Sequence, residues 1–164
     1  MTVLLAYHPQ MRKFMKINCY TIAILLFLYT ATAFSHTITV FQCVNKNNRK
    51  VNVSLNNRVY DYQFGKLDQA PDIRISRTPN QLSQFYFKTQ AADTDTGYAS
   101  GMEIDFKNGD YTYTIYSSDI GSQHQAGVYV YKKNKLLTEI KCVPNTVLDN
   151  MYQHIFELPE RDIY

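Results

Sequence analysis

Around Asn108-Gly109, apolar and polar residues alternate on both sides of a turn signal, and this pattern constrains the fold more than any other. Asn-Gly is the preferred pair for a two-residue type I′ turn, because both central positions need a positive φ. Folding the chain there brings apolar pairs together on one face: Phe106 with Tyr111, Ile104 with Tyr113, and Met102 with Ile115. The opposite face is polar, so the segment predicts an antiparallel hairpin buried on one side.

The same period of two recurs along the chain between clusters of turn residues. These further strands are expected at residues 37–44, 50–55, 59–64, 72–76, 84–88, 127–132 and 135–142, with a turn at Lys133-Asn134 between the last two. Short strands separated by turn signals at this spacing are typical of sandwiches and barrels. The fold class is therefore all-β, an antiparallel sandwich or barrel of about eight or nine strands.

The C-terminal segment has a different period. The apolar residues Val147, Leu148, Met151, Tyr152 and Ile155 follow helical spacing, and Thr146 with Asp149 resembles a capping box. We expect one C-terminal α-helix over residues 146–157 that covers an end or a face of the sheet.

Residues 1–35 have the three parts of a secretory signal peptide. Arg12, Lys13 and Lys16 form a basic start, an apolar run covers residues 22–29, and Ala31-Thr32-Ala33 offers a cleavage site. The run is short for a bilayer-spanning helix, which needs about 20 apolar residues, although an uncleaved anchor is the alternative. Met11 and Met15 are alternative starts. After cleavage we expect no further membrane association.

Two cysteines remain after the leader is removed. Cys43 and Cys142 lie near opposite ends of residues 36–164, and Cys19 lies in the leader. An even pair in an exported chain most simply forms a disulfide, with two buried thiols as the alternative. We expect a single disulfide-closed domain that is periplasmic or secreted.

The formal charge of +3 comes from the leader, because its three basic residues account for the whole excess of Lys and Arg. Residues 36–164 are therefore neutral overall and contain no run of four or more basic residues. This balance argues against nucleic acid as a partner.

The sequence offers no catalytic or cofactor motif. No pair of histidines has metal-ligand spacing, and no Gly-x-Ser-x-Gly elbow is present. The segment starting at Asp93 resembles a calcium loop, but Gly97 and Tyr98 occupy positions that need a ligand and a glycine. We therefore expect no metal, no cofactor and no enzymatic activity.

Residues 91–101 are the best candidate for a binding site. They form a polar segment that leads into the hairpin, and binding residues concentrate on loops held by a rigid scaffold. Tyr98 offers a large anchor with few rotamers, Ser100 a hydroxyl donor, and Lys107 a charge for the same rim. A solvated connector without a role is the alternative.

A resemblance accompanies these motifs. Cys43, Tyr60-Asp61-Tyr62-Gln63-Phe64-Gly65-Lys66, Asn108-Gly109-Asp110-Tyr111-Thr112-Tyr113, Ala126-Gly127-Val128-Tyr129-Val130 and Cys142 together resemble a group of small exported bacterial β proteins of unknown function. More loosely, the chain is similar to periplasmic inhibitors of C-type lysozyme, which carry Ser-Gly-x-x-Tyr. Here the tyrosine precedes the pair, as Tyr98-Ala99-Ser100-Gly101.

These observations favour an exported protein-binding module, such as an inhibitor of lysozyme or an immunity protein, whose partner is a protein. The alternative function is an envelope structural or assembly protein that pairs through a strand edge.

Overall fold

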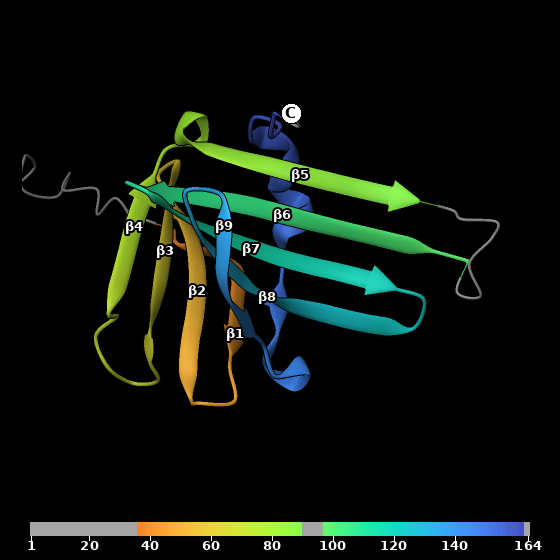
Figure 1. The fold of residues 1–164 in the computed structure, drawn as a ribbon. Helices are drawn as coiled ribbons and strands as arrows, with labels where there is room; N and C mark the ends of the chain where they lie inside the picture. Colours follow the sequence, from red (N-terminus) through yellow and green to blue (C-terminus); the bar gives the residue numbers. More distant parts are fainter. Residues whose placement is uncertain (1–35, 90–96, 163–164) are drawn as a thin grey trace, which may run out of the picture. The chain divides into compact units, whose positions relative to one another are not determined.

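A computed structural model describes residues 36–89 and 97–162, which form two antiparallel sheets of five strands each (Figure 1). The first sheet contains β1 (Ile38–Val44), β2 (Arg49–Asn56), β3 (Val59–Lys66), β4 (Ile73–Arg77) and β10 (Leu148–Asp149), in the order β10-β1-β2-β3-β4. The second sheet contains β5 (Leu82–Thr89), β6 (Ala99–Asn108), β7 (Tyr111–Ile120), β8 (Gln123–Lys132) and β9 (Lys135–Lys141), in chain order. The chain thus completes one meander, crosses over through a 3-10 turn (η2, Pro79–Gln81), and then forms the other.

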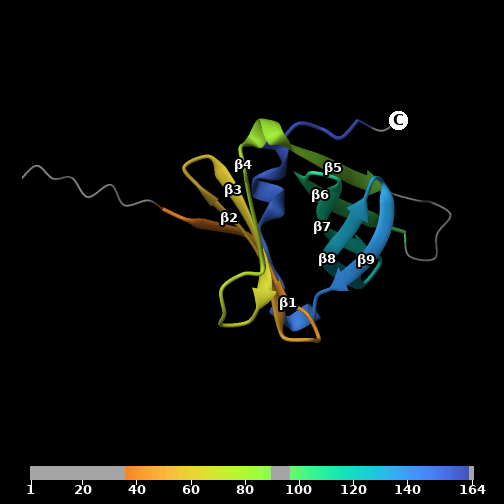
Figure 2. The same cartoon turned by 60° about the vertical axis from the view of Figure 1, so that its left-hand side comes forward.

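The sheets pack face to face, which confirms the all-β prediction and selects a sandwich (Figure 2). Tyr62 of the first sheet lies with its ring centre 5.6 Å from that of Phe106 and 5.4 Å from that of Tyr113 in the second. Around this contact the core is almost free of exposed surface: Phe41, Val51, Val53, Tyr60, Ile104, Ile115 and Val128 are at most 1% exposed. We call the face that carries these residues the inner face of each sheet.

Two hairpin turns have left-handed residues at both central positions. The φ angles are 47° and 64° at Asn57-Arg58, and 47° and 65° at Lys133-Asn134. Two positive φ angles in a two-residue loop are the mark of a type I′ turn, whose twist matches that of the flanking strands. The predicted turn at Lys133-Asn134 is confirmed.

The central hairpin folds one residue later than its Asn-Gly pair suggested. Asn108 is the last residue of β6 and pairs with Tyr111, so Gly109 and Asp110 form the loop. Of these residues only Gly109 has a positive φ, of 59°, as in a type II′ turn. The predicted type I′ turn and its pairing are therefore wrong by two positions, and the observed pairs are Phe106 with Tyr113, Ile104 with Ile115, and Met102 with Ser117.

The C-terminal helical segment forms, but as short 3-10 turns instead of one α-helix. These turns are η3 (Pro144–Thr146), η4 (Met151–Gln153) and η5 (Ile155–Glu157), with β10 between the first two. The interruption has a tertiary cause: the backbone N–H of Asn150 donates to Val40 O at 2.9 Å, and its side chain donates to Thr39 O. Met151 and Ile155 are nonetheless fully buried, as their spacing predicted. No helix among the described residues has the length and apolar character needed to cross a membrane.

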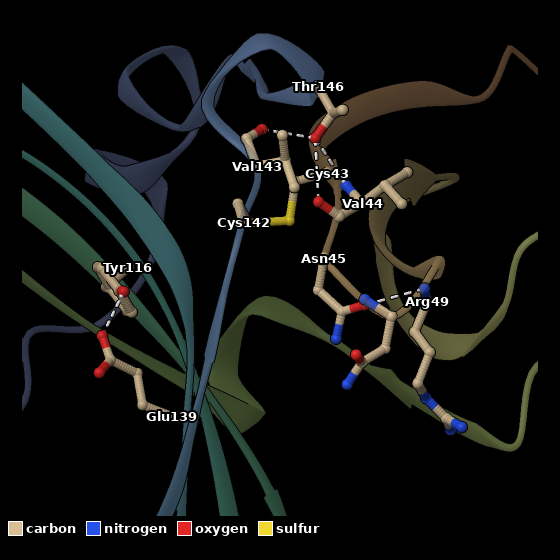
Figure 3. Close-up of a disulfide and its surroundings, with 10 residues drawn as sticks. Cys43, Val44, Asn45, Arg49, Tyr116, Glu139, Cys142, Val143 and Thr146 are labelled. Atoms are coloured by element: carbon tan, nitrogen blue, oxygen red, sulfur yellow. Dashed lines mark hydrogen bonds between the residues drawn. A yellow bond between two sulfur atoms is a disulfide. The ribbon is translucent and has the colours of Figure 1, made fainter.

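The disulfide joins the two sheets, and the prediction that Cys43 bonds to Cys142 is confirmed. The Cα atoms are 5.7 Å apart across a sequence separation of 99 residues. Backbone bonds flank the bridge, since Cys142 N–H donates to Ala126 O and Val143 N–H donates to Val44 O. Thr146 Oγ1 lies between the segments that carry the two cysteines. It accepts a hydrogen bond from Val44 N–H and donates one to Val143 O (Figure 3).

Residues 159–161 form a strap along the free edge of β5. Gln84 N–H donates to Pro159 O at 2.8 Å, and Arg161 N–H donates to Gln84 O at 2.6 Å. The Arg161 guanidinium then reaches the outer face of the second sheet, where it donates twice to Asp105 and once to Glu103. Asp105 is only 4% exposed, so this arginine neutralises a buried charge.

The turn geometry leads to a prediction that separates the two registers. Gly109→Val should lower the free energy of unfolding by about 1–3 kcal/mol, because a β-branched residue strongly disfavours positive φ. Asn108→Val should cost less than about 0.5 kcal/mol, because Asn108 is an exposed strand residue. Chemical denaturation measures both. A large loss for Asn108→Val would contradict the observed turn.

The strap gives a second prediction. Arg161→Met should destabilise the fold by about 2 kcal/mol, because it leaves the buried Asp105 carboxylate with hydroxyl donors alone. Lys133→Met is the matched control: its ion pair with Asp110 is exposed, with 75% of the Lys133 side chain accessible, and should matter by less than about 0.5 kcal/mol. Equal losses in urea denaturation would show that the strap does not stabilise the sandwich.

Candidate functional site

The second sheet is longer than the first, and its far half forms an overhang. Strands β6, β7 and β8 have ten residues each, whereas β1 has seven. In Figure 1 the ends of β5 to β8 run well beyond the strands of the first sheet. The inner-facing residues change character there: apolar Ile104 and Ile115 give way along the same strands to Ser100 and Asp119. The overhang is thus an inner face that the described strands of the first sheet leave uncovered.

A pocket of about 350 Å³ lies between the overhang and the C-terminal segment. We call it the overhang pocket. Its walls come from four strands and η4: Tyr86, Lys88, Tyr98, Ser100, Gly101, Met102, Ser117, Asp119, Asp149 and Tyr152. Strand alternation explains this lining, because residues two apart on one strand share a face.

Three aromatic rings gather at one side of the overhang pocket. Tyr86 lies edge-on to Tyr152 and Phe156, with ring centres 6.2 Å and 5.4 Å away, and Tyr152 lies 5.3 Å from Phe156. We call these residues the aromatic cluster. Tyr152 is 60% exposed and Phe156 is 59% exposed. Large exposed aromatic side chains in contact are characteristic of interaction surfaces.

The polar side of the pocket carries both signs of charge. Lys88 Nζ lies 5.9 Å from the centre of the Tyr98 ring, within cation–π range. Asp119 Oδ1 contacts Nδ1 of His124 on the next strand at 2.8 Å. Asp149 Oδ1 accepts the Met151 N–H at 2.8 Å, which anchors the start of η4. The walls are therefore held by local contacts and are partly preorganised.

Ser100, Asp119 and His124 occupy directly paired positions on three neighbouring strands. In a nucleophilic serine site the imidazole lies between the hydroxyl and the carboxylate, so that it can take the hydroxyl proton. Here the carboxylate is in the middle. These three side chains supply hydrogen-bond donors and acceptors, but their order lacks the geometry that activates a serine. Among residues 36–89 and 97–162, no group of His, Cys, Asp or Glu is arranged to hold a metal ion.

Of the predicted site residues, the structure brings Tyr98 and Ser100 together in the overhang pocket and leaves Lys107 out. Lys107 lies at the opposite end of β6, nine residues from Tyr98, a distance of about 30 Å along a strand. Its carbonyl accepts from Arg77 of β4 instead. Residues 91–96 of the predicted loop, with the calcium-like segment, lie outside the described residues.

Sequence reasoning missed the other half of the pocket. Tyr152 was expected on the buried side of an α-helix, and Phe156 was not part of the pattern. The missing signal was the spacing of these two aromatic residues, which are four positions apart and out of phase with the buried pair Met151 and Ile155.

Comparison with protein-family models, curated proteins and solved structures finds no match to this chain.

The exposed cluster gives a stability prediction with an internal control. Tyr152→Ala and Phe156→Ala should each change the free energy of unfolding by less than about 1 kcal/mol, because more than half of each side chain is already in water. Met151→Ala and Ile155→Ala, in the same segment, should cost about 2–5 kcal/mol each. Thermal denaturation of the four variants tests this, and comparable losses in all four would mean that the cluster is structural.

Proposed function

We propose that this chain is an exported module that binds another protein through the overhang pocket and the aromatic cluster. The observation that carries the proposal is the exposure of Tyr152 and Phe156 beside Tyr98 and Ser100, on elements that hydrogen bonds fix in place. Aromatic anchors with few rotamers supply most of the binding energy at many protein interfaces. The disulfide supports export, because such bonds persist in oxidising compartments.

The pocket favours a partner that presents a basic side chain. Tyr86, Tyr98 and Tyr152 offer ring faces, and Asp119 and Asp149 add carboxylates on the same lining. Arginine and lysine side chains bind to such combinations through charge-assisted hydrogen bonds and cation–π contact. Lys88, which already lies over Tyr98, is an internal example of this contact.

Because the overhang pocket is concave, we expect a side chain of the partner to enter it. In this arrangement no loop of this chain has to enter a cleft on the partner. Within this proposal the partner is a secreted hydrolase such as a C-type lysozyme, which the chain would inhibit, or a delivered toxin, against which it would give immunity.

Pairing through a strand edge is the weaker function, because each edge of the described sheets is protected. The edge strand β4 is short and carries Arg74 and Arg77, the strap occupies the edge of β5 at Gln84, and β10 has only two residues. The remaining edge, β9, exposes Leu136 and Leu137, but its register shifts opposite Val130 and Tyr131. A bulge of this kind bends the edge away from regular pairing.

The test is the affinity of the partner for variants of the pocket. We expect a C-type lysozyme, or else a protein recovered from the envelope and secreted fractions, to bind the wild-type chain. It should bind the double variant Tyr98→Ala, Tyr152→Ala at least about tenfold more weakly, because this variant lacks two aromatic anchors. Surface plasmon resonance with the purified chain measures this.

Lys107→Ala/Leu136→Ala is the matched control, because both residues are exposed and lie outside the pocket. Its affinity should stay within about 0.5 kcal/mol of the wild type. Wild-type affinity in the pocket variant with weakened binding in the control would reject this site and favour the β9 edge.

A further inference from the structure

A second pocket, separate from the overhang, lies at the end of the sandwich where the β2–β3 turn, η2 and η5 meet. Its volume is about 640 Å³, within the range of sites for small molecules. Leu55, Pro79 and the ring of Tyr60 form apolar walls, while Arg58, Thr78 and Glu157 supply polar groups. We call it the end pocket.

Arg58 and Glu157 line this pocket without pairing with each other. Among the described residues neither charge has an ion-pair partner, although the two have opposite signs. Both residues are exposed, so each charge is available to a ligand that enters the pocket. The lining of the end pocket therefore combines an unpaired cation, an unpaired anion and apolar surface.

Arg58 occupies a position that its residue type does not favour. It is the second central residue of a type I′ turn, with φ of 64°. Glycine is preferred there, because it adopts positive φ without a steric penalty. Strained positions are concentrated where function holds the residue in place.

Tyr60 contributes to the wall of the end pocket. The residue is fully buried, and its hydroxyl has no hydrogen-bond partner among the described residues. Burial and the negative charge of Glu157 raise the pKa of Tyr60 to about 12. The hydroxyl therefore stays protonated at neutral pH.

We propose that the end pocket binds a small zwitterionic ligand, an amino acid or short peptide with an apolar side chain. Its carboxylate binds to Arg58, its ammonium group binds to Glu157, and its side chain packs against Leu55 and Pro79. A zwitterion suits this site because it pairs with both Arg58 and Glu157 at once. A simple anion would pair with Arg58 alone, and a simple cation would pair with Glu157 alone.

Calorimetry with the purified chain tests this, with L-leucine, Leu-Ala and Leu-Ala-Ala as probes at about 10 mM, where millimolar dissociation constants are still measurable. At least one probe should bind. Its N-acetylated and C-amidated forms should each bind about fivefold to tenfold more weakly, because each has lost one charge-assisted hydrogen bond. No heat from any of the three probes overturns the proposal.

Arg58→Gly separates binding from folding. Glycine relieves the left-handed backbone, so the melting temperature should rise, while affinity for the free peptide falls to that of its amide. Undiminished affinity in Arg58→Gly overturns the assignment whether or not the overhang pocket binds a protein.

Discussion

The bond between Cys43 and Cys142 connects the first strand of one sheet to the end of the last strand of the other. The chain itself passes between the sheets twice, from β4 to β5 and from β9 to β10. Closing a loop of about 100 residues removes enough freedom from the unfolded chain to contribute up to about 4.7 kcal/mol. The disulfide also fixes where the chain goes next. Directly after Cys142, Val143 and Thr146 bond to Val44, and β10 then pairs with β1. The C-terminal segment thus lies along the sandwich at a defined place.

That placement creates the candidate site. The first sheet ends before the second, and the uncovered inner face would be an open platform if nothing bordered it (Figure 1). Asp149 and Tyr152 supply a wall, while Met151 and Ile155 bury their side chains in the core and hold that wall in place. The exposed rings and the buried apolar residues therefore alternate along one short segment. Their different roles follow from which side of the segment faces the sandwich.

Much of the fold follows from local patterns, and the failures have identifiable causes. Alternation assigned the faces of Ile104, Phe106 and Ile115 correctly, because a strand has only two faces. It could not fix the register, since a shift by two residues preserves both faces. The register is given by the pairing of Asn108 with Tyr111, which became visible only in the structure.

Tertiary contacts account for the remaining differences. Helical spacing found Met151 and Ile155, but the bond from Asn150 to Val40 breaks the helix, and its partner is far away in sequence. Tyr98 and Ser100 were found because they flank a polar segment. Tyr152, Phe156 and Asp149 approach them only through the disulfide-fixed return of the chain, which no local pattern encodes. Lys107 was assigned to the same rim through closeness in sequence, and an extended strand carries it to the opposite end.

Hydroxyl-radical footprinting, read by mass spectrometry with and without the bound protein partner, tests the central claim most directly. Our account predicts strong labelling of Tyr98, Tyr152 and Phe156 in the free chain, little labelling of Tyr60 and Tyr62, and protection of the first three by the partner. Leu136 and Leu137 on β9 should be labelled equally in both states. Protection of these two leucines, with Tyr152 and Phe156 still labelled in the complex, would contradict the assignment of the overhang as the binding surface.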